Sequence, residues 1–154
     1  MRLTELLAPL TEAGAKPIYY FAYGMLTDPN NMESANLVGV ATLPNYTFEM
    51  LQFANVVATP GSKVYGCLWE IDRDLLAQLD RTEGYPIFYD RKTVPVLCNG
   101  TRYEAELYTM TPASREDLLG TIPSGQYIKS VRRGYKYAGV PLEQLKDRKS
   151  TRLN

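Results

Sequence analysis

The stretch VYGCLWEIDRDLLAQLDRTEG, from Val64 to Gly84, joins the clearest strand of the chain to a helix. Its first eight residues are mostly β-branched, aromatic or apolar, and they predict a strand over residues 64–71. Asp72 follows at the position where a helix N-cap is expected. The apolar residues after it recur at helical spacing: Leu75, Leu76 and Leu79. Gly84 ends the helical pattern, because glycine accepts the positive φ of a helix C-terminus.

This strand needs partners, and the sequence offers them on both sides. Short β-prone runs bounded by turn residues predict further strands over residues 18–23, 37–43, 46–57, 89–97 and 101–110. Pro44-Asn45 and the segment Thr59–Ser62 are interpreted as turns between consecutive strands. Asn99-Gly100 lies between the last two runs, where this dipeptide is a strong hairpin signal.

Helices are predicted near both ends of the chain. A helical spacing of leucines covers Leu3–Ala13, and a second apolar stripe follows Pro123-Ser124 and stops at Gly139. A short last helix runs from Pro141 through Leu145. Because the strands are mostly adjacent in sequence and alternate irregularly with helices, we predict an α+β fold, with a mixed, mainly antiparallel sheet curled towards a barrel and helices at its flanks.

The length of 154 residues fits one domain. We assign residues 1–15 to an N-terminal helix appended to this domain, residues 16–145 to the domain itself, and residues 146–154 to a polar tail. The oligomeric state predicted is a monomer or a homodimer.

Composition excludes several classes of function. Lys plus Arg equals Asp plus Glu, at 17 each, which argues against a nucleic-acid binder. No apolar run is long enough to span a bilayer and the start of the chain does not resemble a secretory signal, so we expect a cytoplasmic protein with buried thiols at Cys67 and Cys98. The chain has no histidine, which removes Ser-His-Asp and Cys-His catalysis and the usual His-containing zinc site.

Glu83 stands out as a carboxyl group on an apolar helical face. Leu76, Leu79 and Glu83 fall at spacings of three and four, so Glu83 continues the buried stripe at the last turn of the helix. Partial desolvation and the negative end of the helix dipole both raise a carboxyl pKa above its usual value of about 4.3. Such a carboxyl suits general acid–base catalysis near neutral pH. From the residues alone, a solvated side chain at a frayed helix end remains an alternative, and Asp80, which lies off the stripe, is a weaker candidate.

The turn Tyr23-Gly24-Met25-Leu26 is a second candidate site. The predicted strand ends there, so main-chain N–H groups that no longer belong to a ladder can bind a carboxylate or a phosphate. Glycine also lets a ligand approach the backbone closely. The alternative is a plain strand end. Tyr108 and Tyr127 can each face a cavity or pack in the core, and the residues alone favour packing.

A basic face is predicted on the C-terminal helix, where it comprises Lys129, Arg132, Arg133 and Lys136. We interpret this face as solvated surface. A protein or nucleic-acid adaptor that uses it is the third-ranked hypothesis for function.

Three separated segments resemble one family, the γ-glutamylcyclotransferase-like superfamily with its AIG2-like fold. Residues Tyr20–Pro29, YFAYGMLTDP, resemble its signature turn. Residues Leu79–Tyr85, LDRTEGY, followed by Tyr89–Arg91, resemble its catalytic-glutamate segment. Pro123–Gly134 together with Ala138–Pro141 is similar to its C-terminal helix and closing turn. The resemblance covers about residues 19–145 in the family's order.

This resemblance implies a small mixed barrel with flanking helices and a cavity at one end. It implies a reaction in which the α-amine of a small γ-glutamyl peptide or amine attacks its own γ-carbonyl, yielding 5-oxoproline and a released amine. Glu83 would be the general acid and base, the turn from Tyr23 to Leu26 would bind the substrate carboxylate, and Tyr127 and Tyr108 would line the site. The reaction needs no cofactor and no metal.

Met25 departs from the family pattern, which usually has Ser or Thr after the glycine. If the turn binds substrate only through its backbone, Met25 is tolerated. If a hydroxyl is needed, activity is changed or lost. A catalytically inactive relative that binds a small ligand or a protein is therefore the alternative function.

Overall fold

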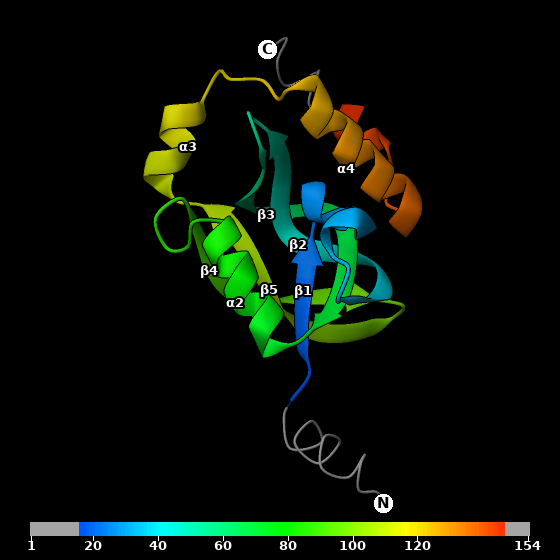
Figure 1. Ribbon diagram of the computed structural model, residues 1–154. Coiled ribbons are helices and arrows are strands. Elements are labelled where there is room, and N and C mark those ends of the chain that lie inside the picture. Colours follow the sequence, from blue (N-terminus) through cyan, green and yellow to red (C-terminus); the bar gives the residue numbers. More distant parts are fainter. Residues whose placement is uncertain (1–15, 147–154) are drawn as a thin grey trace, which may run out of the picture.

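Five strands close into a barrel in the computed structural model, which describes residues 16–146 (Figure 1). They are β1 (Ile18–Ala22), β2 (Asn36–Met50), β3 (Ala54–Ile71), β4 (Tyr89–Cys98) and β5 (Thr101–Met110). The order around the barrel is β1-β3-β2-β4-β5. Neighbours run antiparallel except β1 and β5, which pair in parallel and close the barrel. The predicted fold, a mixed and mainly antiparallel barrel, is confirmed.

The helices α2 (Arg73–Thr82), α3 (Pro112–Leu118) and α4 (Gly125–Ala138) flank the barrel, with α2 and α3 on one side of the view and α4 on the other (Figure 1). Two short 3-10 turns, η1 (Met25–Thr27) and η2 (Pro29–Asn31), follow β1. Residues 143–146 are also helical, at the end of the predicted last helix. The predicted helix over residues 3–13 lies outside the described residues, as does the predicted tail after Lys146. No helix within residues 16–146 is both long and apolar enough to cross a bilayer.

The prediction of two turns in the β2–β3 region is wrong. Both predicted turns lie within long strands, where Asn45 has a φ of 68° and the Gly61 N–H donates to Asn45 Oδ1 at 3.0 Å. The register of the two strands shifts between Pro44 and Tyr46, as in a β-bulge. A bulge absorbs turn-forming residues without ending the strand, and it adds the bend that barrel closure needs. The real turn lies at residues 51–53 and cuts the strand predicted over residues 46–57.

The helix α2 forms as predicted. The Asp72 carboxylate accepts a hydrogen bond from the Leu75 N–H at 2.8 Å, which confirms the N-cap. Leu75 and Leu79 are buried, and Gly84 leaves the helix with a φ of 68°. Glu83 is the C-cap residue, and its N–H donates to the Leu79 carbonyl at 2.8 Å. The end of the helix therefore holds Glu83 at a fixed place beside the barrel.

Helix α3 is absent from the sequence-based prediction. Thr111 is its N-cap and accepts a hydrogen bond from the Ser114 N–H at 3.2 Å, and Pro112 occupies the first helical position. Both are ordinary helix-start signals. The helix is too short for an apolar stripe to reveal it, so only its cap marks it in the sequence.

Candidate active site

A cavity of about 160 Å³ lies where the end of β1, the β2–β3 turn, the end of α2 and the start of α4 meet. It contains all seven residues that the sequence analysis proposes for the site: Tyr23, Gly24, Met25, Leu26, Glu83, Tyr108 and Tyr127. The remaining lining residues are Tyr20, Phe53, Ala54, Thr82, Phe88 and Tyr89. The structure thus brings together segments that are about sixty and a hundred residues apart in the chain around one concave site, of the kind that binds a small ligand.

Glu83 is the acidic residue of this cavity. The residue is half-buried, and its carboxyl group makes no hydrogen bond or ion pair with any residue in the range 16–146. Burial raises its pKa from the usual 4.5 to about 7. A carboxyl group with that pKa is partly protonated and partly ionised at neutral pH, so it can both accept and donate a proton there.

The turn at residues 23–26 lines the cavity, and its carbonyls are hydrogen-bonded to protein groups. The Gly24 carbonyl accepts hydrogen bonds from the Thr27 N–H at 3.1 Å and from Thr27 Oγ1 at 2.7 Å, and the Leu26 carbonyl accepts from Trp69 Nε1 at 3.0 Å. The N–H groups of Gly24 and Leu26 donate to nothing within the described residues. Free N–H groups at a chain turn beside a cavity are suited to bind an anion such as a carboxylate.

Tyr127 completes this turn from the helix α4. Its hydroxyl oxygen accepts a hydrogen bond from the Ala54 N–H at 3.0 Å. Burial raises the pKa of Tyr127 to about 12, although the N–H groups of Ala54 and Met25 partly oppose that rise. A Cβ atom at Gly24 would lie 2.9 Å from the Ala54 Cβ and 3.1 Å from Tyr127 Oη, so a residue with a side chain does not fit there.

Tyr108 lies in the cavity wall, but its hydroxyl is already occupied. It donates to Asp80 Oδ1 at 2.7 Å, and Asp80 is also ion-paired with Arg91, which in turn lies 3.1 Å from Glu106. This network ties the last turn of α2 to β4 and β5. These contacts therefore fix the last turn of α2, immediately before Glu83, against the barrel.

Helix α4 supports the binding turn from behind. Asp28, just after η1, is fully buried, and Arg133 Nη2 lies 2.7 Å from its Oδ2 while Ser130 donates to the same oxygen at 3.0 Å. Burial raises the pKa of Asp28, but the hydrogen bonds from Arg133, Asn30 and Ser130 outweigh that effect and lower it overall. Arg133, one of the four residues of the predicted basic face, is thus bound to the turn.

Sequence reasoning missed part of the site. Tyr20, Phe53, Phe88 and Tyr89 all line the cavity and were not predicted to do so. Successive side chains of a strand point to opposite faces, so Tyr20 and its sequence neighbours lie on different faces of β1. The sequence does not tell which of the two faces meets the cavity. Within residues 16–146, no group of three or more Cys, Asp and Glu side chains is placed to hold a metal ion.

Comparison with known proteins agrees with this geometry. A family model described as "Gamma-glutamyl cyclotransferase, AIG2-like" matches residues 20–129. A protein of Bos taurus named Gamma-glutamylcyclotransferase is 26% identical over 151 residues, which cover 88% of this chain and 79% of the bovine protein.

Solved structures show the same fold. The crystal structure of an uncharacterized protein from Homo sapiens has a TM-score of 0.75 and 26% identity over 88% of both chains. A structure named Gamma-glutamyl cyclotransferase has a TM-score of 0.72 and 25% identity over 87% of both chains. YkqA from Bacillus subtilis, at 22% identity, has a TM-score of 0.72 and covers 94% of this chain and 57% of its own, which shows the fold alone. Since the matching family model spans most of the chain and includes both the turn and Glu83, this chain belongs to the gamma-glutamyl cyclotransferase, AIG2-like family.

Proposed function

We propose that this chain is a γ-glutamylcyclotransferase that converts a small γ-glutamyl peptide or amine into 5-oxoproline and the free amine. One observation carries the proposal. A carboxyl group without a protein partner, at Glu83, shares a small cavity with the free N–H groups of Gly24 and Leu26. The first can move a proton and the second can bind a carboxylate, and an amino acid head group presents both an ammonium and a carboxylate.

The N–H groups of the turn, with the Tyr127 hydroxyl, bind the α-carboxylate of the substrate. Glu83 then takes a proton from the α-ammonium, and the freed amine attacks the γ-carbonyl carbon. A C–N bond forms and the carbonyl oxygen becomes an oxyanion. Glu83 donates its proton to the leaving nitrogen, the old C–N bond breaks and the carbonyl is restored. The second proton of the ring nitrogen passes through Glu83 to the released amine, which departs as an ammonium ion.

The pKa of Glu83 suits these transfers. An α-amino group titrates near 8, so moving its proton to a carboxylate with a pKa of about 7 costs only about 1.4 kcal/mol, against about 5 kcal/mol for a carboxylate at 4.5. The ring closure itself is intramolecular. Holding the two ends of the glutamyl group in line can therefore supply roughly 7–11 kcal/mol of the barrier reduction.

The test is release of 5-oxoproline from a panel of γ-glutamyl dipeptides and γ-glutamylamines. Glu83→Gln should abolish release, because the amide keeps the shape of the side chain and cannot shuttle the proton. The matched control is Glu143→Gln, which changes an exposed glutamate in the same way. Activity retained in Glu83→Gln would remove this residue from the role, while turnover lost equally in both variants would point to a general effect on the fold.

Met25 favours a second function, a relative that binds the same head group without turnover. The Met25 side chain is half-buried and packs against the core, so the turn offers a ligand only its backbone at this position. If the wild-type protein releases no 5-oxoproline from any member of the panel, yet a γ-glutamyl compound raises its melting temperature, the binding function is supported instead.

Three further features belong to the proposal. Residues 16–145 form the catalytic domain, to which the first fifteen residues are appended. The enzyme acts in the cytoplasm, which the two buried free cysteines, Cys67 and Cys98, favour. Its partner is the small-molecule substrate.

A further inference from the structure

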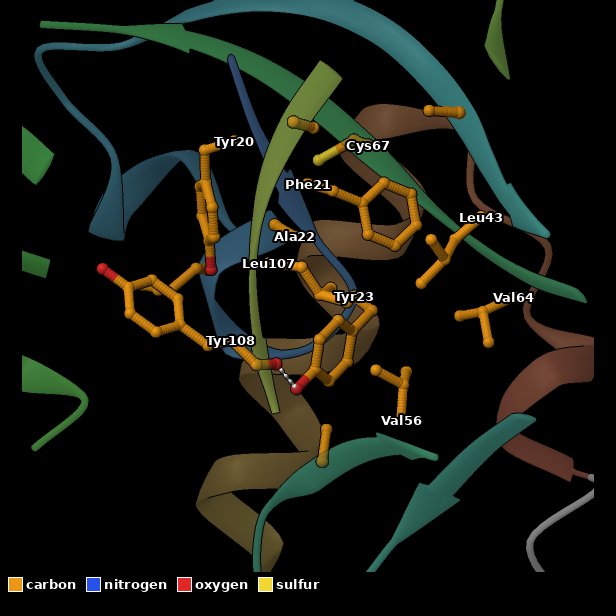
Figure 2. Close-up of a cluster of buried hydrophobic side chains, with 14 of the residues drawn as sticks. Tyr20, Phe21, Ala22, Tyr23, Leu43, Val56, Val64, Cys67, Leu107 and Tyr108 are labelled. Atoms are coloured by element: carbon orange, nitrogen blue, oxygen red, sulfur yellow. Dashed lines mark hydrogen bonds between the residues drawn. The ribbon is translucent and has the colours of Figure 1, made fainter. Parts of the chain in front are cut away.

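Five tyrosines line the cavity: Tyr20, Tyr23, Tyr89, Tyr108 and Tyr127. They differ in whether their hydroxyl groups already donate a hydrogen bond to the protein. Three of the five hydroxyls donate a hydrogen bond to a protein atom. Tyr23 donates to the Tyr108 carbonyl at 2.7 Å, Tyr89 to the Ala54 carbonyl at 2.8 Å and Tyr108 to a carboxylate on α2 (Figure 2 shows the first of these bonds). Only two of the five hydroxyls are therefore free to donate to a substrate.

The first of these two, on Tyr127, belongs to the carboxylate end of the site. Its oxygen lies 3.1 Å from the position of a Cβ atom on Gly24 and accepts the Ala54 N–H. Its own proton therefore points away from Ala54 and is available beside the free N–H groups of the turn. An α-carboxylate bound there accepts a hydrogen bond from the Tyr127 hydroxyl.

The second free hydroxyl, on Tyr20, has no partner among residues 16–146. Tyr20 is only 4% exposed, and its hydroxyl neither donates nor accepts a hydrogen bond within the described residues. Its ring lies against that of Tyr108, edge to face, with 5.8 Å between the centroids, and Figure 2 shows the pair on the opposite side of the strands from Phe21 and Leu43. Buried hydroxyls without a hydrogen-bond partner are uncommon, because burying a polar group that makes no hydrogen bond lowers stability.

Tyr20 shares the cavity with Glu83 and lies within reach of its charge. Burial, followed by the negative charge of Glu83, raises the pKa of Tyr20 well above its usual value. The hydroxyl therefore keeps its proton throughout the pH range of the reaction. A hydroxyl that stays protonated and has no acceptor in the described part of the chain is suited to donate a hydrogen bond to an oxygen that gains negative charge.

We propose that Tyr20 is a catalytic residue whose hydroxyl donates a hydrogen bond to the γ-carbonyl oxygen of the substrate as that oxygen becomes negative. The inference rests on the proposed cyclotransferase function. When the amine nitrogen attacks the γ-carbon, the carbonyl electron pair moves onto oxygen, which accepts the bond from Tyr20. When the leaving amine departs with the proton from Glu83, the electron pair returns to form the lactam carbonyl. Tyr20 keeps its own proton throughout.

The test is Tyr20→Phe, which removes one oxygen atom. Loss of a single donor to an oxyanion lowers kcat by roughly 100- to 1000-fold, and KM should rise much less, because the bond to the neutral carbonyl is weaker than the bond to the oxyanion. The melting temperature should stay the same or rise, since the lost hydroxyl had no protein partner. The matched control is Tyr19→Phe, which changes the next residue on the opposite face of β1, where the ring packs on Tyr103, and it should leave kcat unchanged.

The outcomes separate this inference from the proposed function. If the wild type turns over and Tyr20→Phe keeps its kcat within about threefold, the oxyanion role is overturned while the cyclotransferase stands. A fall in kcat together with a fall in melting temperature equally overturns it, because it shows a structural role.

If the wild type shows no turnover, the proposed function fails and the inference is judged by binding. 5-Oxoproline is the probe, because its lactam carbonyl is the former γ-carbonyl. Tighter binding to the wild type and to Tyr19→Phe than to Tyr20→Phe supports the contact. Equal binding by all three proteins, or none by the wild type, overturns it.

Discussion

Glu83 makes the folded protein less stable at alkaline pH, and the size of that effect follows from its pKa. Burial raises the pKa of the carboxyl from 4.5 in the unfolded chain to about 7 in the folded protein. Each pKa unit corresponds to about 1.4 kcal/mol of ionisation free energy. Ionising Glu83 therefore costs the folded state about 3 kcal/mol more than the unfolded chain. Because the residue keeps some contact with solvent, we expect about 2–3 kcal/mol.

The sign follows from proton binding. Between pH 4.5 and about 7 the folded state holds the proton that the unfolded chain has released, so the free energy of unfolding falls as the pH rises. The stabilising contribution is complete below pH 4.5 and lost above about 7. Glu83→Gln cannot ionise. It should therefore match the wild type near pH 4.5 and exceed it by about 2–3 kcal/mol above about pH 8.

Urea unfolding or thermal melting of both proteins across this pH range measures the difference. For a chain of this size the gap at about pH 8 amounts to roughly 4–12 °C in melting temperature. Comparing the two proteins at each pH cancels the titration of all other groups. Glu143→Gln, a change of the same kind at an exposed glutamate, is the matched control variant. A Glu83→Gln difference that is constant with pH, or that is largest at acid pH, would refute the reasoning.

Three further predictions follow from the same geometry. The kcat/KM of the wild type should fall about tenfold for each pH unit below about 7, as initial rates between about pH 5 and 8 would show, because the reaction begins with the ionised carboxyl of Glu83. Gly24→Ala should raise KM at least tenfold, as steady-state kinetics would show, because its Cβ would lie 2.9 Å from the Ala54 Cβ and displace the turn. Gly134→Ala should lower the free energy of unfolding by about 1–3 kcal/mol in urea titrations, because its Cβ would overlap Thr27 Oγ1 where α4 meets η1.

Local signals predicted the parts of the fold that local residues determine. Asn99 and Gly100 have φ values of 53° and 79°, and they form the β4–β5 hairpin turn as their dipeptide predicts. Asp72 caps α2, and Gly84 ends it. In each case the residue recognised in the sequence is also the one that adopts the turn or cap conformation, so a local sequence pattern is sufficient to predict the structure.

The β2–β3 turn could not be predicted in this way, because distant residues hold it in place. Residues 51–53 contain no glycine, proline or asparagine. The Gln52 N–H donates to Thr121 Oγ1 at 2.8 Å, and the Phe53 ring packs against Phe88 and Tyr127. This turn brings Phe53 and Ala54 to the cavity, so misplacing it also hid one wall of the site.

The roles of the tyrosines depend on contacts between elements in the same way. Helical periodicity pointed to Glu83 as a carboxyl on a buried helix face, and the family resemblance was needed to choose it over a solvated side chain. No such rule separates Tyr20 from Tyr108, since both are strand tyrosines beside the same cavity. The Tyr108 hydroxyl donates its hydrogen bond to Asp80, a residue of α2, whereas the Tyr20 hydroxyl meets no such acceptor among residues 16–146. The difference between them exists only in the packed protein.

These contacts also bear on Met25, the residue that departs from the family pattern. The groups that the turn offers to an anion are main-chain N–H groups, and their directions are fixed from behind by Trp69 on the Leu26 carbonyl and by Tyr135 on the Tyr23 carbonyl, at 2.7 Å. None of these contacts involves the side chain at position 25. A hydroxyl there would add a donor to a site that already has two free N–H groups and the Tyr127 hydroxyl. Met25 is therefore expected to change the strength of substrate binding, while the proposed turnover would depend on Glu83 and Tyr20.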